Sequence, residues 1–385
     1  MKVLHIIEGL DKRLGGLPYS VSNIIRVEKE LGYCSFVLSI EEHSYELDTV
    51  EFNEENLFLF SSSFPKRFYR SKNAIEWLKK NISNFELLVF HSTWNVLCLE
   101  SSMVARKAGV PYIVWPHGSL DPFDLQKKQL FKKILGPLIV KPYLEHSKFI
   151  CCTSDKEAQM LVTYSASCQI HSIPLPVFSI SPSSPSSLSV SFREKYQYSD
   201  DDFVFLFLSR INYKKGLEDL LNAISLLPDL YKQKVKLAIA GTGEPLYVEK
   251  IKELVVKLKL QEVVSFLGQL SGYDKIAAFY GSDTFVLTSQ NENFGIVIVE
   301  AMQAGLPALV SNNVYICSSI EAHKAGWVCE LNEISIVHAL TTIIESVPLM
   351  IDFQKNAFQL GQSFSVPQLK VKYKNLYESA VKSSN

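Results

Sequence analysis

Residues 282–310, SDTFVLTSQNENFGIVIVEAMQAGLPALV, decide the fold of this chain. The stretch begins with a short apolar run at 283–289, bounded by polar residues, as in a buried strand. A helical pattern follows over 295–304 and ends at Gly305, with Pro307 beyond it, which is a common stop signal for a helix. The sequence therefore predicts a strand, a loop, a helix, a turn and a second strand, the repeating unit of a parallel α/β sheet.

The loop at 291–295 lies at the predicted start of that helix. Backbone N–H groups at a helix start lack partners within the helix, and with the helix dipole they favour an anion such as a diphosphate. Gly295 would let a ligand approach the backbone closely. Glu292 is placed to accept hydrogen bonds from hexose hydroxyls, and Glu300 to bind a ribose diol. We therefore expect this stretch to bind a sugar nucleotide.

These carboxylates have two alternative interpretations. Both could be solvated, but the apolar neighbours of Glu300 disfavour full exposure, and a buried carboxylate needs a partner. The pair could instead be the acid and base of a glycosidase, whose carboxyl groups lie about 5–9.5 Å apart. Eight residues of helix rise about 12 Å, so the spacing of Glu292 and Glu300 favours a clamp on two ends of one extended ligand.

The whole chain has a globular composition, with 385 residues, 47% hydrophobic and 21% charged, which is enough for two domains. A net charge of −1 disfavours nucleic acid as the main partner. No apolar run approaches the length of a membrane span, and the N-terminus is charged too early for a signal peptide. Of the seven cysteines, Cys151 and Cys152 are adjacent and the others are scattered, which predicts neither a disulfide framework nor a zinc site. We therefore expect the protein to lie in the cytosol.

Apolar runs alternate with helical patterns on both sides of a stretch rich in Ser and Pro, which predicts parallel sheets. The expected strands are 3–7, 36–40, 57–60, 87–90, 112–115 and 149–152, then 203–208, 235–240, 263–267, 283–289 and 307–311. The stretch at 181–191 reads as a linker between domains at 1–180 and 192–365. The expected fold is α/β, with two Rossmann-like doubly wound domains facing across a cleft.

Two cations follow the predicted strand at 203–208. Arg210 and Lys215 lie at its carboxyl end, where open α/β sheets bind ligands. They would neutralise a leaving diphosphate without a metal, although a solvated basic loop is the alternative. After the next predicted strand, Gly241 and Gly243 form another strand-to-helix turn, although a GxG pattern of this kind is often only a tight turn.

The first half holds weaker candidates. Gly15 and Gly16 follow the first strand and suggest a phosphate-approach loop, but the third glycine of a dinucleotide fingerprint is missing, and a plain loop is the alternative. His117, in the segment WPHGSLDP, lies between Pro and Gly after a strand and suits a cleft. Ser119 and His91, which also ends a strand, are expected to touch an acceptor. For both histidines a structural role is the alternative.

Residues 124–143 form a basic amphipathic segment whose lysines are Lys127, Lys128, Lys132 and Lys133. Such a helix can lie on an anionic membrane surface. An ordinary surface helix with its apolar stripe in the core is the alternative.

Together these residues resemble family 4 of the glycosyltransferases, retaining enzymes with the GT-B fold. The resemblance covers most of the chain and is most specific in Gly241-x-Gly243 and in the E-x7-E of Glu292 and Glu300. It also includes the glycine pair, PHGSLDP, residues 153–157 and Arg210 with Lys215-Gly216. The form PHGSLDP resembles that of transferases that build bacterial surface polysaccharides. The segment after Ser311 lacks a Pro-Trp pair often seen there.

The resemblance implies that the first domain binds an acceptor and the second a nucleotide sugar of UDP or GDP type, with no metal or other cofactor. It implies that the last helix, within 366–385, packs back on the first domain. It also implies roles for single residues: diphosphate binding for Arg210 and Lys215, hexose for Glu292, ribose for Glu300, backbone amides from Asn293, Phe294 and Gly295, and a place at the reacting centre for His117.

The expected activity is transfer of a hexose, with retention, to a hydroxyl of a lipid-linked or growing bacterial glycan such as O-antigen, capsule or exopolysaccharide. The chain would act in the cytoplasm, at the inner face of the plasma membrane. A non-catalytic sugar-nucleotide-binding subunit of a glycan assembly complex is the alternative. An NAD-dependent oxidoreductase would need a GxGxxG loop and an acidic residue on the next strand, and neither is clear here.

Overall fold

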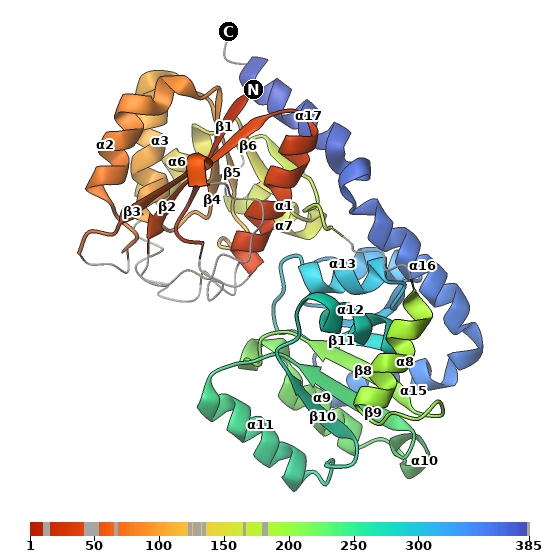
Figure 1. Cartoon of the computed structure of the whole chain (residues 1–385). Helices are drawn as coiled ribbons and strands as arrows, with labels where there is room; N and C mark the ends of the chain where they lie inside the picture. Colours follow the sequence, from red (N-terminus) through yellow and green to blue (C-terminus); the bar gives the residue numbers. More distant parts are fainter. Residues whose placement is uncertain are drawn as a thin grey trace. The chain divides into compact units, whose positions relative to one another are not determined.

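A computed structural model of the protein describes residues 1–10, 16–41, 54–64, 68–121, 125, 132, 136–164, 167–178 and 184–382. The chain divides into two compact units (Figure 1). Unit 1 combines Met1–Pro176 with Val366–Asn385, and unit 2 is Val177–Ser365. Each unit is described by itself.

Unit 1 is built on a seven-stranded sheet with the order β3-β2-β1-β4-β5-β6-β7, and every pairing in it is parallel. Its strands are β1 Lys2–Ile7, β2 Cys34–Glu41, β3 Leu57–Ser61, β4 Leu87–His91, β5 Tyr112–Trp115, β6 Phe149–Cys152 and β7 Ile170–Ser172. The order reverses between β1 and β4. Their carboxyl ends therefore form the topological switch point, where open α/β sheets bind ligands.

The helices of unit 1 that matter for the site are α1 Gly16–Glu30, α2 Lys72–Asn81, α3 Val96–Ala108, α6 Lys141–Glu145, α7 Asp155–Tyr164 and α17 Val366–Lys382, with shorter turns at η2 Glu54–Asn56, η4 Ile82–Asn84 and η5 Gly136–Val140. Asn95 begins α3 because its side-chain oxygen accepts a hydrogen bond from the N–H of Cys98 at 2.7 Å. Gly109 ends the same helix in the left-handed conformation.

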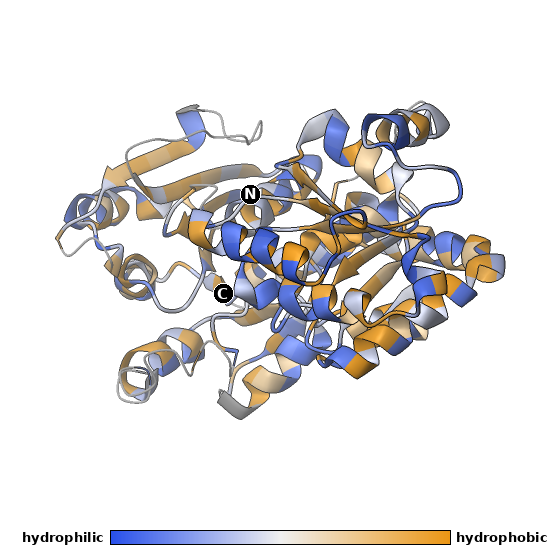
Figure 2. Ribbon diagram, turned by 90° about the horizontal axis from the view of Figure 1, so that it is seen from below, coloured by the Kyte–Doolittle hydropathy of each residue, from blue (hydrophilic) through white to orange (hydrophobic). Residues whose placement is uncertain are grey.

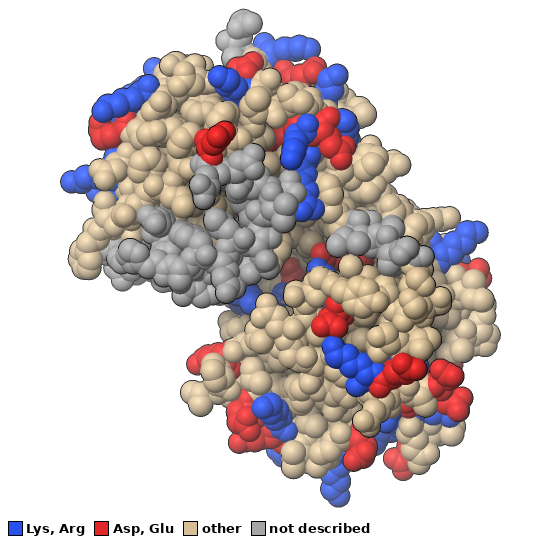
Figure 3. All heavy atoms as spheres, in the orientation of Figure 1, with Lys and Arg blue, Asp and Glu red and all other residues tan. Residues whose placement is uncertain are grey.

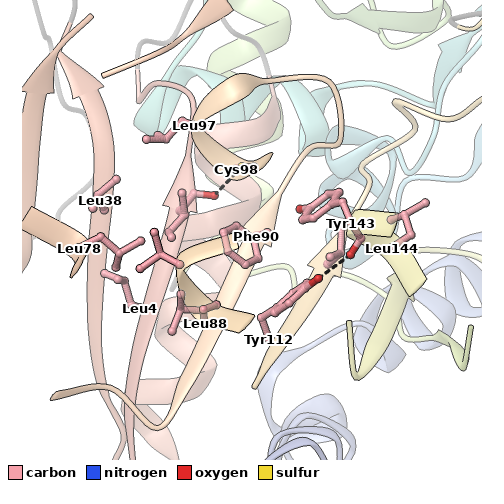
Figure 4. Close-up of a cluster of buried hydrophobic side chains, with 14 of the residues drawn as sticks. Leu4, Leu38, Leu78, Leu88, Phe90, Leu97, Cys98, Tyr112, Tyr143 and Leu144 are labelled. Carbon is pink, nitrogen blue, oxygen red and sulfur yellow. Dashed lines mark hydrogen bonds between the residues drawn. The ribbon is translucent and has the colours of Figure 1, made fainter. Parts of the chain in front are cut away.

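Buried side chains from the sheet and its helices form the core of unit 1 (Figure 4). Leu4, Leu88 and Phe90 from β1 and β4 lie with Leu78 of α2 and Cys98 of α3. The hydroxyl of Tyr112 in this part donates to the carbonyl of Tyr143 at 2.7 Å, because a buried polar group needs a partner. Figure 2 shows the strands mostly in the hydrophobic colour, as expected for parallel sheets covered on both faces.

The last helix, α17, packs in unit 1 beside α1 (Figure 1). Its Tyr373 and Tyr377 are completely buried. Tyr373 stacks with Trp115 of β5 at 5.9 Å between ring centroids, and Tyr377 with Tyr33 at 6.3 Å. Residues more than 200 positions apart in the sequence thus share one core.

Unit 2 has a six-stranded parallel sheet with the order β10-β9-β8-β11-β12-β13. Its strands are β8 Phe203–Leu208, β9 Val235–Ala240, β10 Val264–Gly268, β11 Thr284–Leu287, β12 Ala308–Ser311 and β13 Gly326–Cys329. Its helices and turns are α8 Pro185–Lys195, η6 Tyr213–Lys215, α9 Leu217–Ser225, α10 Asp229–Lys232, α11 Pro245–Lys257, α12 Gly272–Gly281, α13 Ile296–Gln303, α14 Cys317–Ala322, α15 Glu333–Glu345, η7 Val347–Leu349 and α16 Met350–Ser363. Here the order reverses between β8 and β11.

The two predicted doubly wound parallel sheets are confirmed. Strands β7 and β13, at the edges of the two sheets, were not predicted. The expected linker at 181–191 is partly wrong, because α8 begins at Pro185. Proline suits the first turn of a helix. Leu188 and Phe192, four residues apart, are both buried and anchor this helix to unit 2.

Candidate functional site

The structure brings Lys215 and Glu292 together at the switch point of unit 2. Lys215 follows β8 in the turn η6, and Glu292 lies in the loop after β11. The ammonium of Lys215 donates to Oε2 of Glu292 in an ion pair, and the two side chains are 18% and 19% exposed. A cation and a carboxylate predicted separately are thus partners at the edge where ligands bind such sheets.

Hydrogen bonds to backbone carbonyls hold the two loops against each other. Thr288 donates through its hydroxyl to the carbonyl of Gly216 at 2.9 Å, and the N–H of Gln290 donates to the carbonyl of Lys214 at 2.7 Å. Gly216 has φ of 67°, and a Cβ there would lie 1.8 Å from the carbonyl oxygen of Thr288. Only glycine permits this close approach, which places Lys215.

The loop carrying Glu292 is also fixed from the side of β12. The N–H of Tyr315 donates to the carbonyl of Glu292 at 2.9 Å, and the N–H of Glu292 donates to the carbonyl of Asn313 at 3.3 Å. These bonds form a short parallel bridge between Glu292 and Val314. The carboxylate therefore projects from a segment that is braced on both sides.

The glycines of the predicted GxG turn have a structural explanation. A Cβ at Gly241 would lie 1.9 Å from the carbonyl oxygen of Ser209, and one at Gly243 would lie 2.0 Å from that of Ile211. The N–H of Ile211 donates across the same contact to the carbonyl of Thr242 at 2.8 Å. The two glycines thus let the loop after β9 touch the loop that carries Arg210, whose side chain is exposed.

Glu300 lies in α13. Its apolar surroundings predicted that the carboxylate would have a partner, and the structure shows one. Lys275 of α12 donates to Oε1 of Glu300 at 2.7 Å, and the side chains are 28% and 22% exposed. A pocket of about 100 Å³ opens beside this pair, also lined by Phe178, Phe279 and Gln303. Lys275 was not singled out from the sequence, since nothing local to it indicates that α12 packs beside α13.

The start of α13 partly matches the prediction. Gly295 precedes the helix with φ of 74°, which favours glycine, and a Cβ there would meet the side chain of Ile298 at 2.5 Å. Asn293 is partly exposed, whereas Phe294 is buried and packs edge-on against Phe364 at 5.6 Å. The side chain of Phe294 therefore anchors the loop to the core, and only its backbone remains a candidate for ligand binding.

In unit 1, three histidines from separate segments form one hydrogen-bonded line. Nδ1 of His5 in β1 lies 3.0 Å from Nε2 of His91, which ends β4. Nδ1 of His91 lies 2.9 Å from Nε2 of His117, which follows β5. Burial lowers the pKa of His91 well below its usual range and that of His117 to about 3, so both rings are neutral near pH 7.

A carboxylate ends this line inside the unit. Nε2 of His5 lies 2.9 Å from Oε2 of Glu28 in α1, and both residues are completely buried. Oε2 also accepts from the hydroxyl of Ser35, and Oε1 accepts from the hydroxyl of Tyr377 at 2.6 Å. Neither His5 nor Glu28 was predicted, because one reads as part of a strand and the other as part of a helix.

The acceptor contact expected for His91 is corrected by this arrangement. Its side chain is completely buried, and both ring nitrogens are bonded to other histidines. The hydroxyl of Ser119 is partly exposed and lies 2.8 Å from that of Thr93. His117 is partly exposed and has φ of 51°, an uncommon backbone conformation outside glycine. Of the three, only Ser119 and His117 are placed to reach a ligand.

Two carboxylates support the loop of His117 and the neighbouring strand end. Glu157 of α7 accepts from the N–H of Gly118 at 2.8 Å and from that of Thr153 at 2.8 Å. Glu8, directly after β1, accepts from the amide of Asn95 at 2.7 Å, and burial raises the pKa of Glu8 to about 7. Neither role was predicted. An acidic residue directly after a strand was the available signal for Glu8.

Some predicted residues lie outside the described part of the chain. They are Gly15 and, in the basic segment, Lys127, Lys128 and Lys133. Gly16 begins α1, and its carbonyl accepts from the hydroxyl of Ser20 at 3.0 Å. The ammonium of Lys132 lies 5.1 Å from the ring centroid of Trp94.

Acidic and basic side chains are mixed over the described surface seen in Figure 3. Within the described residues, no group of three or more His, Cys, Asp or Glu side chains is arranged to hold a metal ion. Among them, too, no single helix has the length and apolar character to cross a membrane. One pair bent by 64°, Glu333–Glu345 with Val347–Lys382, passes by length and composition only.

Comparison with known proteins finds a family model that matches part of the chain. Residues 191–360, which include Arg210, Lys215, Glu292 and Glu300, match the family described as glycosyl transferases group 1. These matches support a glycosyltransferase. An uncharacterized glycosyltransferase of Methanocaldococcus jannaschii is 32% identical over 40% of this chain and 39% of its own length.

A second relative covers more of the chain. The alpha-monoglucosyldiacylglycerol synthase of Streptococcus pneumoniae is 25% identical over 63% of this chain and 56% of its own length. The chain thus spans 39–56% of the length of these two relatives. A structure of Anabaena HepE in complex with UDP and glucose covers 98% of this chain and 100% of its own, with a TM-score of 0.78 and 18% identity. This likeness confirms the predicted GT-B fold.

Proposed function

We propose that this chain is a retaining hexosyltransferase that moves a hexose from a nucleotide-diphospho-sugar to a hydroxyl of a lipid-linked or growing bacterial glycan. The observation that carries the proposal is the ion pair of Lys215 and Glu292, held at the carboxyl ends of β8 and β11 by the backbone of both loops. It lies within the segment that matches group 1 glycosyl transferases.

The pair suits a ligand that has a charged part beside a hydroxylated part. Lys215 would bind the diphosphate together with Arg210 and the N–H groups at the start of α13. Glu292 would accept hydrogen bonds from the hexose. Glu300, beside the pocket at α12 and α13, would bind the ribose. While no donor is bound, Lys215 and Glu292 neutralise each other, so an arriving donor exchanges one ion pair for two charge-assisted contacts.

In the proposed reaction, the bond between the anomeric carbon and the phosphate oxygen breaks, and its electron pair leaves with the nucleoside diphosphate. The acceptor oxygen bonds to the same face of the anomeric carbon, and its proton passes to the departing phosphate. Lys215 and Arg210 stabilise charge that grows on that phosphate, which lowers the barrier because the interaction strengthens in the transition state. These side chains supply the positive charge, and we propose no metal.

Relatives of this chain support the proposed substrates. The complex of Anabaena HepE with UDP supports a UDP-type donor, with a GDP-type donor as the alternative. The name of the Streptococcus pneumoniae relative supports an acceptor that is linked to lipid. We therefore propose action in the cytoplasm, at the inner face of the plasma membrane, on an O-antigen, capsule or exopolysaccharide precursor.

We also propose that residues 124–143 contact the anionic membrane surface through their lysines. Each lysine near such a surface contributes about 1 kcal/mol. Replacing Lys132 and Lys133 by Glu should therefore reduce co-sedimentation with phosphatidylglycerol vesicles at least tenfold. The matched control is Lys79→Glu with Lys80→Glu in α2, where both lysines are exposed. Equal sedimentation of the two double variants would contradict the contact.

The function is tested by combining ligand binding with turnover. A nucleotide that binds only the folded protein raises its melting temperature, so the wild type should be stabilised by UDP or GDP more than by ADP. Lys215→Ala should lower turnover about 100-fold at saturating donor, as for loss of one charge-stabilising group. Lys214→Ala, one residue away, should leave turnover unchanged. A nucleotide-dependent shift without any transfer would favour the non-catalytic subunit, and no shift would contradict the donor site.

A further inference from the structure

We propose that Glu28, acting through His5 and His91, fixes the position of the proton on His117, so that Nδ1 of His117 is left as a hydrogen-bond acceptor for a substrate hydroxyl. The proposal begins from the unbroken line in unit 1: Glu28 to His5 at 2.9 Å, His5 to His91 at 3.0 Å and His91 to His117 at 2.9 Å. Successive rings are nearly parallel, at 16° and 24°.

If Glu28 accepts the first hydrogen bond, the donor and the acceptor of every other bond in the line are determined. An ionised carboxylate only accepts, and a neutral imidazole donates from one nitrogen and accepts at the other. Nε2 of His5 therefore carries its proton, and Nδ1 of His5 accepts. Nε2 of His91 must then donate to His5, and Nδ1 of His91 accepts from Nε2 of His117. The position of the proton on each ring thus determines its position on the next ring.

The surroundings of Glu28 favour its accepting form. Its two oxygens face three donors, namely His5, the hydroxyl of Ser35 and the hydroxyl of Tyr377. A buried carboxylate needs such bonds to offset the loss of water. These donors come from β1, β2 and α17, so three elements of unit 1 converge on a residue that is completely buried.

The other end of the line is less buried than Glu28, His5 and His91. His117 is partly exposed, and the described residues give its Nδ1 no recorded partner. Its ring stacks on Trp115 at 6.0 Å, and the N–H of the next residue, Gly118, is held by Glu157. The ring is thus fixed in orientation by packing and in tautomer by the line behind it.

A nitrogen that only accepts selects a donor such as a sugar hydroxyl. Naming that hydroxyl as one of the transferred hexose or of the acceptor rests on the proposed function. The tautomer itself does not, because it follows from contacts inside unit 1. Glu28, His5 and His91 touch no ligand in this scheme and are positioning residues, comparable to a buried carboxylate that orients a catalytic histidine.

The tautomers can be measured on the unliganded wild-type protein. Two-bond ¹H–¹⁵N correlation spectra of protein labelled with ¹⁵N-histidine distinguish an Nε2–H ring from an Nδ1–H ring. Single substitutions of His5, His91 and His117 assign the signals. We expect Nε2–H for all three rings at pH 7. An Nδ1–H signal for His117 would overturn the proposal, and this result needs no variant of Glu28.

Glu28→Gln tests the cause. Its amide can donate as well as accept, so His117 should change to a mixture of tautomers or to Nδ1–H. The matched control is Glu30→Gln in the same helix, where Glu30 is exposed and pairs only loosely with Lys370 at 3.8 Å. If Glu28→Gln does not fold, Ser35→Ala and Tyr377→Phe each remove one donor and should broaden the same signals. An unchanged His117 signal in every folded variant would overturn the proposal.

Activity gives an independent readout. Glu28→Gln should lower kcat at least tenfold, within the range of a misplaced acid–base group, while the melting-temperature shift caused by UDP or GDP stays the same, because the nucleotide site is in unit 2. Full transfer by a variant with an altered tautomer would overturn the positioning role. Absence of any nucleotide shift in the wild type would instead contradict the proposed function and leave the tautomer assignment standing.

Discussion

The hydroxyl of Tyr377 donates to Oε1 of Glu28 at 2.6 Å, although 349 positions separate the two residues in the sequence. This bond joins the last helix of the chain to the first helix, inside unit 1. A completely buried carboxylate depends on such donors, so removing one of them should lower the stability of the whole unit.

Tyr377→Phe should lower the free energy of unfolding by about 1.5–3 kcal/mol, the contribution of a hydrogen bond to a charged group. The ring stays in place, so the stacking on Tyr33 is kept. Urea denaturation measures the change. Tyr19→Phe is the control, since Tyr19 is 44% exposed and should change stability by less than about 0.5 kcal/mol. Equal effects would show that the hydroxyl of Tyr377 contributes nothing.

Gly216→Ala should be far more damaging than Gly32→Ala. Both glycines have positive φ, 67° and 74°, so each substitution costs about 1–2 kcal/mol of backbone strain. A Cβ at Gly216 also collides with Thr288, whereas one at Gly32 meets no atom within 4 Å. We expect an additional 1–3 kcal/mol of destabilisation from overpacking, together with loss of turnover. Similar urea midpoints for the two variants would contradict the tight contact between the loops.

Glu300→Gln should weaken binding of UDP more than binding of its 2′,3′-dideoxy analogue. A hydrogen bond to a charged group is worth about 1.5–3 kcal/mol, so the preference of the wild type for the ribose form should fall by roughly tenfold or more. Calorimetric titration gives both affinities. Glu249→Gln, at an exposed position of α11, should keep the preference. A wild type that binds both ligands equally would remove Glu300 from the ribose site.

Glu8 should make stability fall as pH rises from about 4.5 to 7. Burial raises its pKa in the folded protein from 4.5 to about 7. Below pH 4.5 the carboxyl is protonated in both states. Between the two values the unfolded chain releases this proton and the folded protein retains it, so unfolding becomes easier by up to about 3 kcal/mol.

Glu8→Gln isolates this effect from other titrating groups. The amide is neutral at every pH, so the difference in unfolding free energy between variant and wild type should shift in favour of the variant as pH rises from 4.5 to 7. Urea denaturation at several pH values gives that difference. A constant difference would mean that Glu8 ionises in the folded protein as it does in water.

The sequence was sufficient for features that depend on local pattern. The strand, loop and helix at 282–310 appear as β11, the Glu292 loop and α13, because alternation, glycine and proline report local structure. The partial burial of Glu300 followed from its apolar neighbours. Its partner Lys275 did not, since helix packing decides which side chains meet.

Long-range contacts account for most of what was missed. The line from Glu28 to His117 joins β1, β4, α1 and the loop after β5, and each residue taken alone reads as an ordinary part of its element. The packing of the Phe294 side chain on Phe364, 70 residues later, also had no local signal, although the backbone amide expected of Phe294 is unaffected by it. In α8, serines and prolines suggested a linker, whereas the buried pair Leu188 and Phe192 determines the structure.

The placement of α17 has a consequence for synthesis of the protein. Unit 2 is one continuous segment, Val177–Ser365, and unit 1 is completed only by residues that follow it. At about 5–20 residues per second, roughly 10–40 s pass between translation of Pro176 and of Val366. During that interval the surfaces later covered by Tyr373 and Tyr377 stay open on the nascent chain. Chaperone binding should therefore concentrate on unit 1, and selective profiling of ribosomes with a bound chaperone would detect it there while unit 2 emerges.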